Sequence, residues 1–272
     1  MNDQRAQILL TNDDGIRSPG LWAAAEALSR VGYVTVVAPR EQWTGAGRSM
    51  PITSDGSIRE EHVTVGGKTW TVYAVGGTPA QAVQHAVLEL TPRRPDLLVA
   101  GINYGENVTV GVTMSGTVGA AMEGASFGIP SLAISLQTDS SFFHSHSEEI
   151  DFQVAAHFAA YFGRLLLSLP RVPDVDLLKV DVPAEATTAT PWRVTRLSRT
   201  QYYHPVAPDR SAPGGTQRVG YRVAVEHAGL EPDSDVHVLR IDGCVSVTPI
   251  SLDTTSRVDL ASLESRIRSA VG

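Results

Sequence analysis

Two adjacent carboxylates, Asp13 and Asp14, follow the apolar segment 7–11 in the stretch ILLTNDDG. Neighbouring like charges repel each other, and Asp is a poor strand residue. In the turn that leaves a strand, however, both side chains can point toward one divalent cation, which removes the repulsion. Taken by itself, the stretch is equally consistent with an Asx turn or a helix cap.

Side chains that carry oxygen also follow two other predicted strands. Thr44 and Gly45 lie in the Gly-punctuated loop 39–49, and Asn103 and Asn107 lie in GINYGEN. No Cys and no His cluster accompanies them, and such a set of oxygen donors suits Mg²⁺ or Mn²⁺ better than Zn²⁺. Alone, the loop could be ordinary surface, and the two asparagines could satisfy loop backbone.

A predicted helix begins at Ser115, Gly116 and Thr117. Hydroxyls and free backbone N–H groups at a helix start can hold a phosphate, although Ser and Thr also serve there as simple caps. A cation beside a phosphate cradle implies metal-assisted phosphoryl chemistry, in which a metal-polarised water attacks phosphorus. One of the two aspartates would orient this water or accept its proton. An aspartyl-phosphate intermediate is the lesser option, because DDG lacks the DxD spacing.

These residues come together if the chain forms a parallel sheet, because such sheets bind ligands at the carboxyl ends of their strands. The hydrophobic pattern alternates between strand and helix periods, which predicts a Rossmann-like, mostly parallel α/β sheet with helices on both faces. We expect strands at 7–11, 33–38, 96–100, 129–136 and 177–182, a hairpin at 62–75, and helices at 19–32, 78–90, 116–125 and 150–169.

The sequence changes character after Pro183. Two polar, β-prone stretches, 194–203 and 218–226, flank the Pro- and Gly-rich segment 205–215. This pattern predicts a protruding β-hairpin arm used for association, followed by a strand at 244–249 and a helix at 258–271. We therefore divide the chain into a catalytic core, 1–190, and a hairpin-arm and C-terminal oligomerisation region, 191–272.

Composition excludes several classes of function. The net charge of -7 argues against nucleic acid as the main partner and against an anionic membrane surface. Cys244 is the only cysteine, and no apolar run reaches the roughly 18 residues of a membrane span, so we expect a cytoplasmic protein. The dinucleotide fingerprint, the Walker A motif and the GxSxG elbow are all missing. His144 and His146 could bind a metal, but a simple loop is the preferred reading.

Six motifs, in order, resemble the SurE family, the survival-protein-E 5'/3'-nucleotidases: ILLTNDDGIRSPGL, VVAPREQWTGAG, GGTPAQAV, DLLVAGINYGEN, SGTVGAAMEG and CVSVTPISLD. The resemblance implies a phosphomonoesterase that uses Mg²⁺ or Mn²⁺ to hydrolyse nucleoside monophosphates. It also implies homodimers that exchange C-terminal elements and often pair into tetramers through their arms.

The resemblance assigns roles to individual residues. The metal ligands of the family fall on Asp13, Asp14, Thr44 and Asn103. Its residues around the phosphate fall on Asn107, Ser115 and Thr117, which we expect to act in catalysis together with the two aspartates. We expect Asn12, Thr44, Gly45 and Gly116 to contact the substrate as well.

The chain departs from the family pattern around the expected site. Trp43, Thr44 and Gly47 differ in the loop after the second strand, and Tyr104 and Glu106 differ in the GINYGEN stretch. These changes are compatible with the same chemistry, but they leave the substrate undetermined. Two alternatives therefore remain: a phosphatase for a specialised phosphorylated metabolite, and a catalytically silent oligomer that binds nucleotide or metal.

Overall fold

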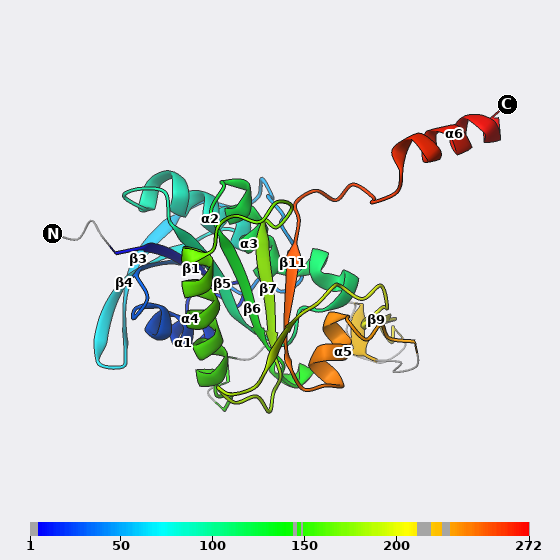
Figure 1. The fold of residues 1–272 in the computed structure, drawn as a ribbon. Coiled ribbons are helices and arrows are strands. Elements are labelled where there is room, and N and C mark those ends of the chain that lie inside the picture. Colours follow the sequence, from blue (N-terminus) through cyan, green and yellow to red (C-terminus); the bar gives the residue numbers. More distant parts are fainter. Residues whose placement is uncertain (1–4, 144–145, 148, 211–218, 225–228, 272) are drawn as a thin grey trace.

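A mixed sheet lies at the centre of the molecule (Figure 1), in a computed structural model that describes residues 5–143, 146–147, 149–210, 219–224 and 229–271. Within these residues the sheet has nine strands in the order β3-β4-β2-β1-β5-β6-β7-β11-β8. Their bounds are β1 Gln7–Thr11, β2 Tyr33–Pro39, β3 Ile58–Val65, β4 Lys68–Val75, β5 Leu97–Tyr104, β6 Ser131–Leu136, β7 Leu177–Val182, β8 Trp192–Val194 and β11 Val245–Ile250.

The six strands from β4 to β7 in this order run parallel, as the sequence predicts. β1 pairs in parallel with β2 and β5, β2 with β4, β5 with β6, and β6 with β7. The two edges break the pattern, because β3 is antiparallel to β4 and β11 is antiparallel to β7. The parallel part brings the carboxyl ends of β1, β2 and β5 to one edge, where the candidate residues lie.

Helices cover both faces of the sheet, which confirms the predicted fold class. α1 (Pro19–Leu28) and α4 (Gln153–Ser168) pack in one hydrophobic cluster with β1 and β5, and α2 (Pro79–His85) and α3 (Gly116–Ser126) pack in another. The predicted helix starts hold, since α1 begins with Pro19 and Thr78 caps α2 in a capping box with Gln81. Residues Ala86–Leu90 continue α2 as a π-helical turn.

β5 runs four residues further than expected and carries Asn103 to the sheet edge. Its register against β6 shifts between Ala100 and Asn103. Gly101 makes the shift possible: its φ is +127°, and a Cβ there would lie 2.2 Å from the carbonyl oxygen of Ile134. Only glycine fits this position, so the sequence places a glycine where the strand must turn its polar end toward the site.

The first strand of the arm begins later in the chain than predicted. The prediction of a strand at 194–203 is wrong. β8 ends at Val194, and β9 (Tyr203–Val206) begins nine residues later. The residues between them run beside α5 (Asp235–Arg240). Residue 198 is held there because its backbone N–H donates to Asp235 Oδ1 over 3.1 Å. β9 pairs in antiparallel fashion with β10 (Gly220–Val223), and residues 211–218 and 225–228 of the predicted arm lie outside the described part of the chain.

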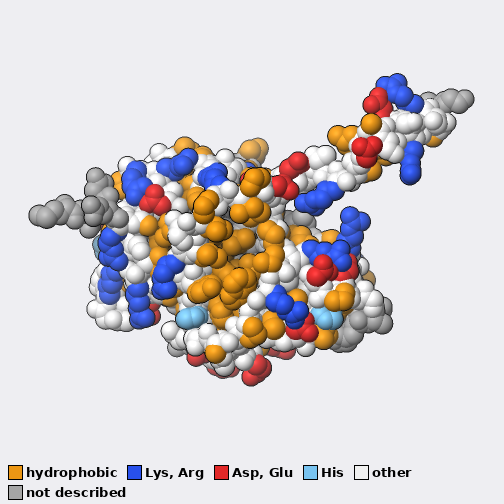
Figure 2. All heavy atoms as spheres, viewed as in Figure 1, with side chains coloured by type: hydrophobic (Ala, Val, Ile, Leu, Met, Phe, Trp, Pro, Cys, Tyr) orange, Lys and Arg blue, Asp and Glu red, His pale blue; other side chains and the backbone are white. Residues whose placement is uncertain are grey.

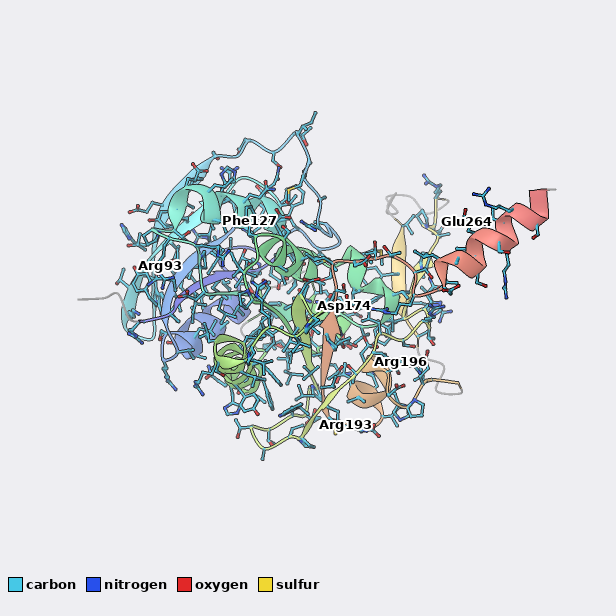
Figure 3. All side chains as sticks on the ribbon, turned by 45° about the horizontal axis from the view of Figure 1, so that its top comes forward. Arg93, Phe127, Asp174, Arg193, Arg196 and Glu264 are labelled. Carbon is cyan, nitrogen blue, oxygen red and sulfur yellow. The ribbon has the colours of Figure 1, made fainter. Side chains whose placement is uncertain are left out.

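The C-terminal helix α6 (Leu260–Val271) projects away from the body of the molecule (Figure 1). Figure 3 shows Glu264 on this helix, far from the labelled residues of the body. Leu260, Leu263 and Ile267 are exposed and lie three and four positions apart, which puts them on one face of the helix. The predicted helix is thus present, with an apolar stripe that the described body does not cover.

Candidate functional site

The NDDG turn places two buried carboxylates at the carboxyl end of β1. Asn12 closes the turn: its Nδ2 donates to the Gly15 carbonyl oxygen over 3.0 Å, and the Gly15 N–H donates back to Asn12 Oδ1 over 3.2 Å. The Asx-turn reading is therefore right for Asn12. Asp13 and Asp14 are 4% and 1% exposed and take no part in closing this turn.

Asp13, Asn103 and Thr117 come together from three elements. The Thr117 hydroxyl donates to Asp13 Oδ1 and lies 3.1 Å from Asn103 Oδ1. Asn103 Nδ2 donates to the carbonyl oxygens of Tyr104 and Gly105, so the amide is oriented with its oxygen toward the carboxylate. Thr117, which we predicted at the phosphate, here supports the predicted metal ligands.

Asp14 is held by groups that the sequence reasoning did not include. Gln42 Nε2 donates to Asp14 Oδ1 over 3.2 Å, and the Tyr104 N–H donates to Oδ2 over 3.4 Å. His146 Nε2 lies 2.8 Å from the carbonyl oxygen of Asp14, which gives this histidine a role in the turn. His144 lies outside the described residues. The signal for Gln42 was its place in the loop after β2, two residues before Thr44.

Burial makes this pair of carboxylates electrostatically unfavourable. It raises the pKa of Asp13 to about 6, and burial together with the charge of Asp13 raises the pKa of Asp14 well above its usual range. A bound cation would reverse both effects. Among the described residues, no group of three or more His, Cys, Asp or Glu side chains is placed to hold a metal ion. The donors that do converge, two carboxylates and the Asn103 amide oxygen, fit a hard cation such as Mg²⁺ or Mn²⁺.

The loop after β2 is anchored against this site. The Trp43 N–H donates to the Asp13 carbonyl oxygen over 2.7 Å, and the Gly47 N–H donates to the carbonyl oxygen of Met114 over 2.9 Å. Thr44 and Gly45 lie between these anchors and line a cavity together with Asp13 and Asp14. The loop is thus part of the site, and metal binding by Thr44 stays a prediction.

Ser115 and Asn107 line the same cavity while making structural contacts. Ser115 Oγ accepts from the Val118 N–H over 3.1 Å and so caps α3, as the alternative interpretation proposed. Asn107 Nδ2 donates to Ser135 Oγ over 2.8 Å. Each side chain retains one polar hydrogen for a ligand, because Ser115 only accepts here and an amide NH₂ group carries two hydrogens.

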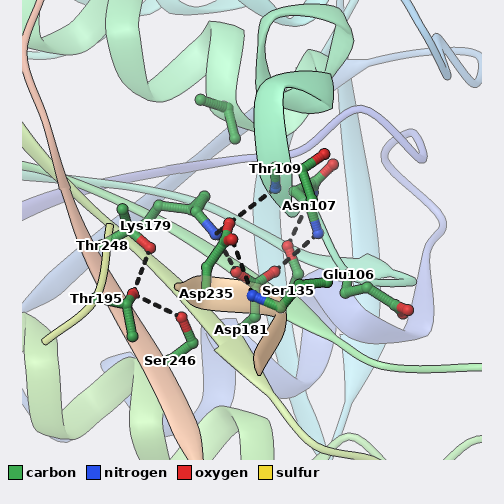
Figure 4. Close-up of polar contacts among 12 residues, drawn as sticks. Glu106, Asn107, Thr109, Ser135, Lys179, Asp181, Thr195, Asp235, Ser246 and Thr248 are labelled. Carbon is green, nitrogen blue, oxygen red and sulfur yellow. Dashed lines mark hydrogen bonds and ion pairs between the residues drawn. The ribbon is translucent and has the colours of Figure 1, made fainter. Parts of the chain in front are cut away.

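A buried ionic cluster that we did not predict fixes the segment around Asn107 (Figure 4). Lys179 Nζ pairs with Asp181, and lies 3.2 Å from Asp235 Oδ2, and all three side chains are fully buried. Asp181 Oδ1 accepts from the Asn107 N–H and Asp235 Oδ2 from the Thr109 N–H, both over 2.8 Å. A signal was present in LLKVDV, where Lys179 and Asp181 share one face of a buried strand.

The ionic cluster predicts a pH-dependent stability. Burial raises the pKa of Asp181 from 3.8 to about 6, against the opposing effect of Lys179. Between these two pH values the folded protein binds more protons than the unfolded chain. The stabilisation that protonated Asp181 gives the fold is therefore complete below pH 3.8 and is lost as the pH rises through 6. Between pH 3.8 and pH 6, the free energy of unfolding of the wild type should fall by about 3 kcal/mol relative to that of Asp181→Asn. Urea unfolding at a series of pH values measures it. A pH-independent difference between the two proteins would contradict the prediction.

Comparisons of this chain with known proteins all find the same protein family. A family model described as survival protein SurE matches residues 8–204. The 5'-nucleotidase SurE of Thermococcus gammatolerans is 41% identical over 261 residues, which cover 95% of this chain and 94% of that protein. The 5'-nucleotidase SurE of Methanosarcina acetivorans is 37% identical over 268 residues, with 95% and 96% covered. The crystal structure of the SurE protein from Aquifex aeolicus has a TM-score of 0.73 and 31% identity, covering 98% of this chain and 100% of that chain.

Proposed function

Because the chain belongs to the SurE family, we propose that it is a metal-dependent phosphomonoesterase that hydrolyses nucleoside monophosphates. The relatives named 5'-nucleotidase support the substrate class. The observation that carries the metal is the pair of buried, adjacent carboxylates Asp13 and Asp14 beside the Asn103 amide oxygen. A cation is the partner that this arrangement requires when both carboxylates are ionised.

Asp13, Asp14, Thr44 and Asn103 would hold Mg²⁺ or Mn²⁺. When bound, the ion supplies a polarised water and neutralises charge on the phosphoryl group. The chain supplies the remaining functions. Ser115 Oγ–H and the second Asn107 Nδ2 hydrogen are placed to donate to phosphate oxygens from the cavity wall.

Proton transfer falls to one of the two aspartates. Both carboxylates line the cavity at the carboxyl end of β1, where an ionised carboxylate can orient an attacking water or accept its proton. Asp13 keeps its orientation through the Thr117 hydroxyl, and Asp14 through Gln42 and the Tyr104 N–H. This is water-mediated hydrolysis without a covalent intermediate.

A substrate panel tests the proposal. Purified protein with Mg²⁺ or Mn²⁺ should release phosphate from nucleoside 5'- and 3'-monophosphates with a higher kcat/KM than from sugar phosphates. A preference for a phosphorylated metabolite outside the nucleotides would instead favour the specialised phosphatase. Nucleotide binding without any turnover across the panel would favour the silent oligomer.

Gly116 offers a test of the geometry around Asp13. A Cβ at this position would lie 2.7 Å from Asp13 Cβ and 2.8 Å from Asp13 Oδ2, which is closer than real contacts allow. Gly116→Ala should therefore displace the carboxylate and weaken Mn²⁺ binding by roughly tenfold or more, while the alanine itself favours the helix. Calorimetric titration with Mn²⁺ measures the change, and Ser126→Ala at the exposed end of α3 is the control. If Gly116→Ala binds Mn²⁺ with unchanged affinity, Asp13 is not a ligand of the metal.

We also propose that the protein is a homodimer that exchanges its C-terminal segment, with a tetramer as the larger assembly. Two observations support the exchange. Figure 2 shows a broad hydrophobic patch over the sheet between α4 and β11. On β8, next to β11, Trp192 is partly exposed and contacts Phe162 of α4. The α6 helix carries its own apolar stripe away from the body. Sedimentation analysis of the full chain and of a chain ending at residue 252 should show a dimer or larger species only for the full chain.

A cytoplasmic location is part of the same proposal. The single cysteine, Cys244, leaves the chain without an internal disulfide, which suits a reducing compartment. Fractionation of the source cells, with immunodetection of the protein in each fraction, tests it directly.

A further inference from the structure

The cavity beside Asp13 and Asp14 is larger than a phosphate group requires. Its volume is about 450 Å³, and its wall includes residues from the arm as well as from the strand ends. The arm gives this wall four non-polar side chains, Tyr203, Pro205, Val219 and Tyr221. The core adds Tyr104, Met114 and Phe143. The site therefore has room for a leaving group with a mainly aromatic surface around it.

The two arm tyrosines form the central piece of this surface. Tyr203 of β9 and Tyr221 of β10 meet edge to face, with ring centroids 5.6 Å apart and an interplanar angle of 89°. Tyr221 is 43% exposed, so much of its ring is open to a ligand. Aromatic side chains with an open face bind flat rings by stacking.

The arm is fixed to the GINYGEN segment through Glu106, the neighbour of Asn107. The Tyr203 hydroxyl donates to the Glu106 carbonyl oxygen over 2.6 Å. The Tyr202 hydroxyl donates to Glu106 Oε1, and Arg240 Nη1 lies 3.2 Å from the same oxygen. Because Arg240 offsets its charge, Glu106 can line the cavity without strong repulsion of an anionic substrate.

The second carboxylate oxygen of Glu106 lacks a partner. Glu106 is 3% exposed, and Oε2 is buried with no hydrogen-bond partner among the described residues. Figure 4 shows its side chain pointing away from the cluster of Lys179, Asp181 and Asp235. A buried, unpartnered carboxylate oxygen costs free energy, which a donor on a bound ligand recovers. Since Glu106 lines the cavity, the leaving group can supply that donor.

We propose that Glu106, Tyr203 and Tyr221 form a leaving-group subsite that selects an aromatic base carrying an amino group. The tyrosines stack on the ring, and Glu106 Oε2 accepts a hydrogen bond from the amino N–H. This inference rests on the proposed function and narrows its substrate from nucleoside monophosphates in general to those with an amino-bearing base.

Two ligands that differ only in the amino group test the subsite. Adenosine 5'-monophosphate is compared with purine riboside 5'-monophosphate, which lacks the 6-amino group, by kcat/KM with Mn²⁺. Their non-hydrolysable methylenephosphonate analogues are compared in parallel by calorimetric Kd. The wild type should prefer the amino-bearing ligand roughly tenfold in both measurements. Glu106→Leu should bring the ratio to about one, and Glu106→Gln, whose amide oxygen still accepts, to an intermediate value.

Variants of Tyr221 test the stacking part of the subsite separately. Tyr221→Leu should lower the affinity for both analogues roughly tenfold, and Tyr221→Phe should restore it, because the ring is retained. Tyr161→Leu is the matched control, since Tyr161 is a similarly exposed tyrosine, 40%, on α4 outside the cavity. An amino preference that is equal in the wild type and Glu106→Leu overturns the subsite, even if phosphate release is normal. Absence of phosphate release with the Kd ratios as expected overturns only the proposed hydrolysis.

Discussion

Replacing Asp14 with asparagine should lower kcat for phosphate release from a nucleoside monophosphate by about a thousandfold or more. The substitution keeps the size of the side chain but removes a negative charge that the proposed cation needs, and it removes a candidate proton acceptor. The Gln42 and Tyr104 contacts to Asp14 are hydrogen bonds to a carboxylate, so the asparagine oxygen can retain only part of them. Steady-state kinetics with Mn²⁺ at saturating substrate gives the measurement.

Asp174→Asn is the matched control for this variant. Asp174 is an exposed residue in the body of the protein (Figure 3), and its φ of +61° is a conformation that asparagine adopts readily. Its replacement should leave kcat within about twofold, because exposed substitutions have small effects. A kcat for Asp14→Asn within tenfold of the wild type would remove Asp14 from the reaction.

Replacing Lys179 with methionine should lower the free energy of unfolding by about 3–5 kcal/mol at neutral pH. The reason is electrostatic: the buried carboxylates of Asp181 and Asp235 would lose the cation that both contact. The loss should shrink near pH 5, because protonation of Asp181 relieves part of the uncompensated charge. Urea unfolding at the two pH values measures both effects.

The other lysine of the chain, Lys68, provides the control. It is exposed at the start of β4, with Nζ 3.8 Å from the centroid of the Trp70 ring. Lys68→Met should cost about 1 kcal/mol or less, the size of an exposed cation–π contact. If Lys179→Met is no more destabilising than Lys68→Met, the buried cluster does not stabilise the fold in the way its geometry indicates.

Local patterns predicted the fold well where neighbouring residues decide the structure. β1 and β7 match their expected bounds, and the starts of α1 and α2 were visible in Ser18-Pro19 and Thr78-Pro79. Of the two predicted caps, Thr78 makes its side-chain hydrogen bond and Ser18 does not. The strand at 194–203 failed because its conformation depends on a distant partner, since the backbone at residue 198 is held by Asp235. Helix α5, which carries Asp235, is only six residues long and gives little periodic signal.

The site was predictable as a collection of residue types and less so as a set of contacts. The carboxylates Asp13 and Asp14 lie at the strand end where the turn was expected, with Asn103 beside them. The use of Thr117 against Asp13 could not be foreseen, because a side chain's partner depends on how α3 packs over β5 and β6. The contact between Tyr202 and Glu106 spans 96 positions in the chain and follows only from the path of the arm.

The most direct test of the central claim is phosphate release from adenosine 5'-monophosphate in the presence of Mn²⁺, in excess chelator, and after Mn²⁺ is added back. We expect hydrolysis with the metal, loss of at least about a thousandfold in chelator, and recovery on re-addition, since Asp13, Asp14 and Asn103 converge as donors for one hard cation. An equal rate of hydrolysis with Mn²⁺ and in excess chelator would contradict the account.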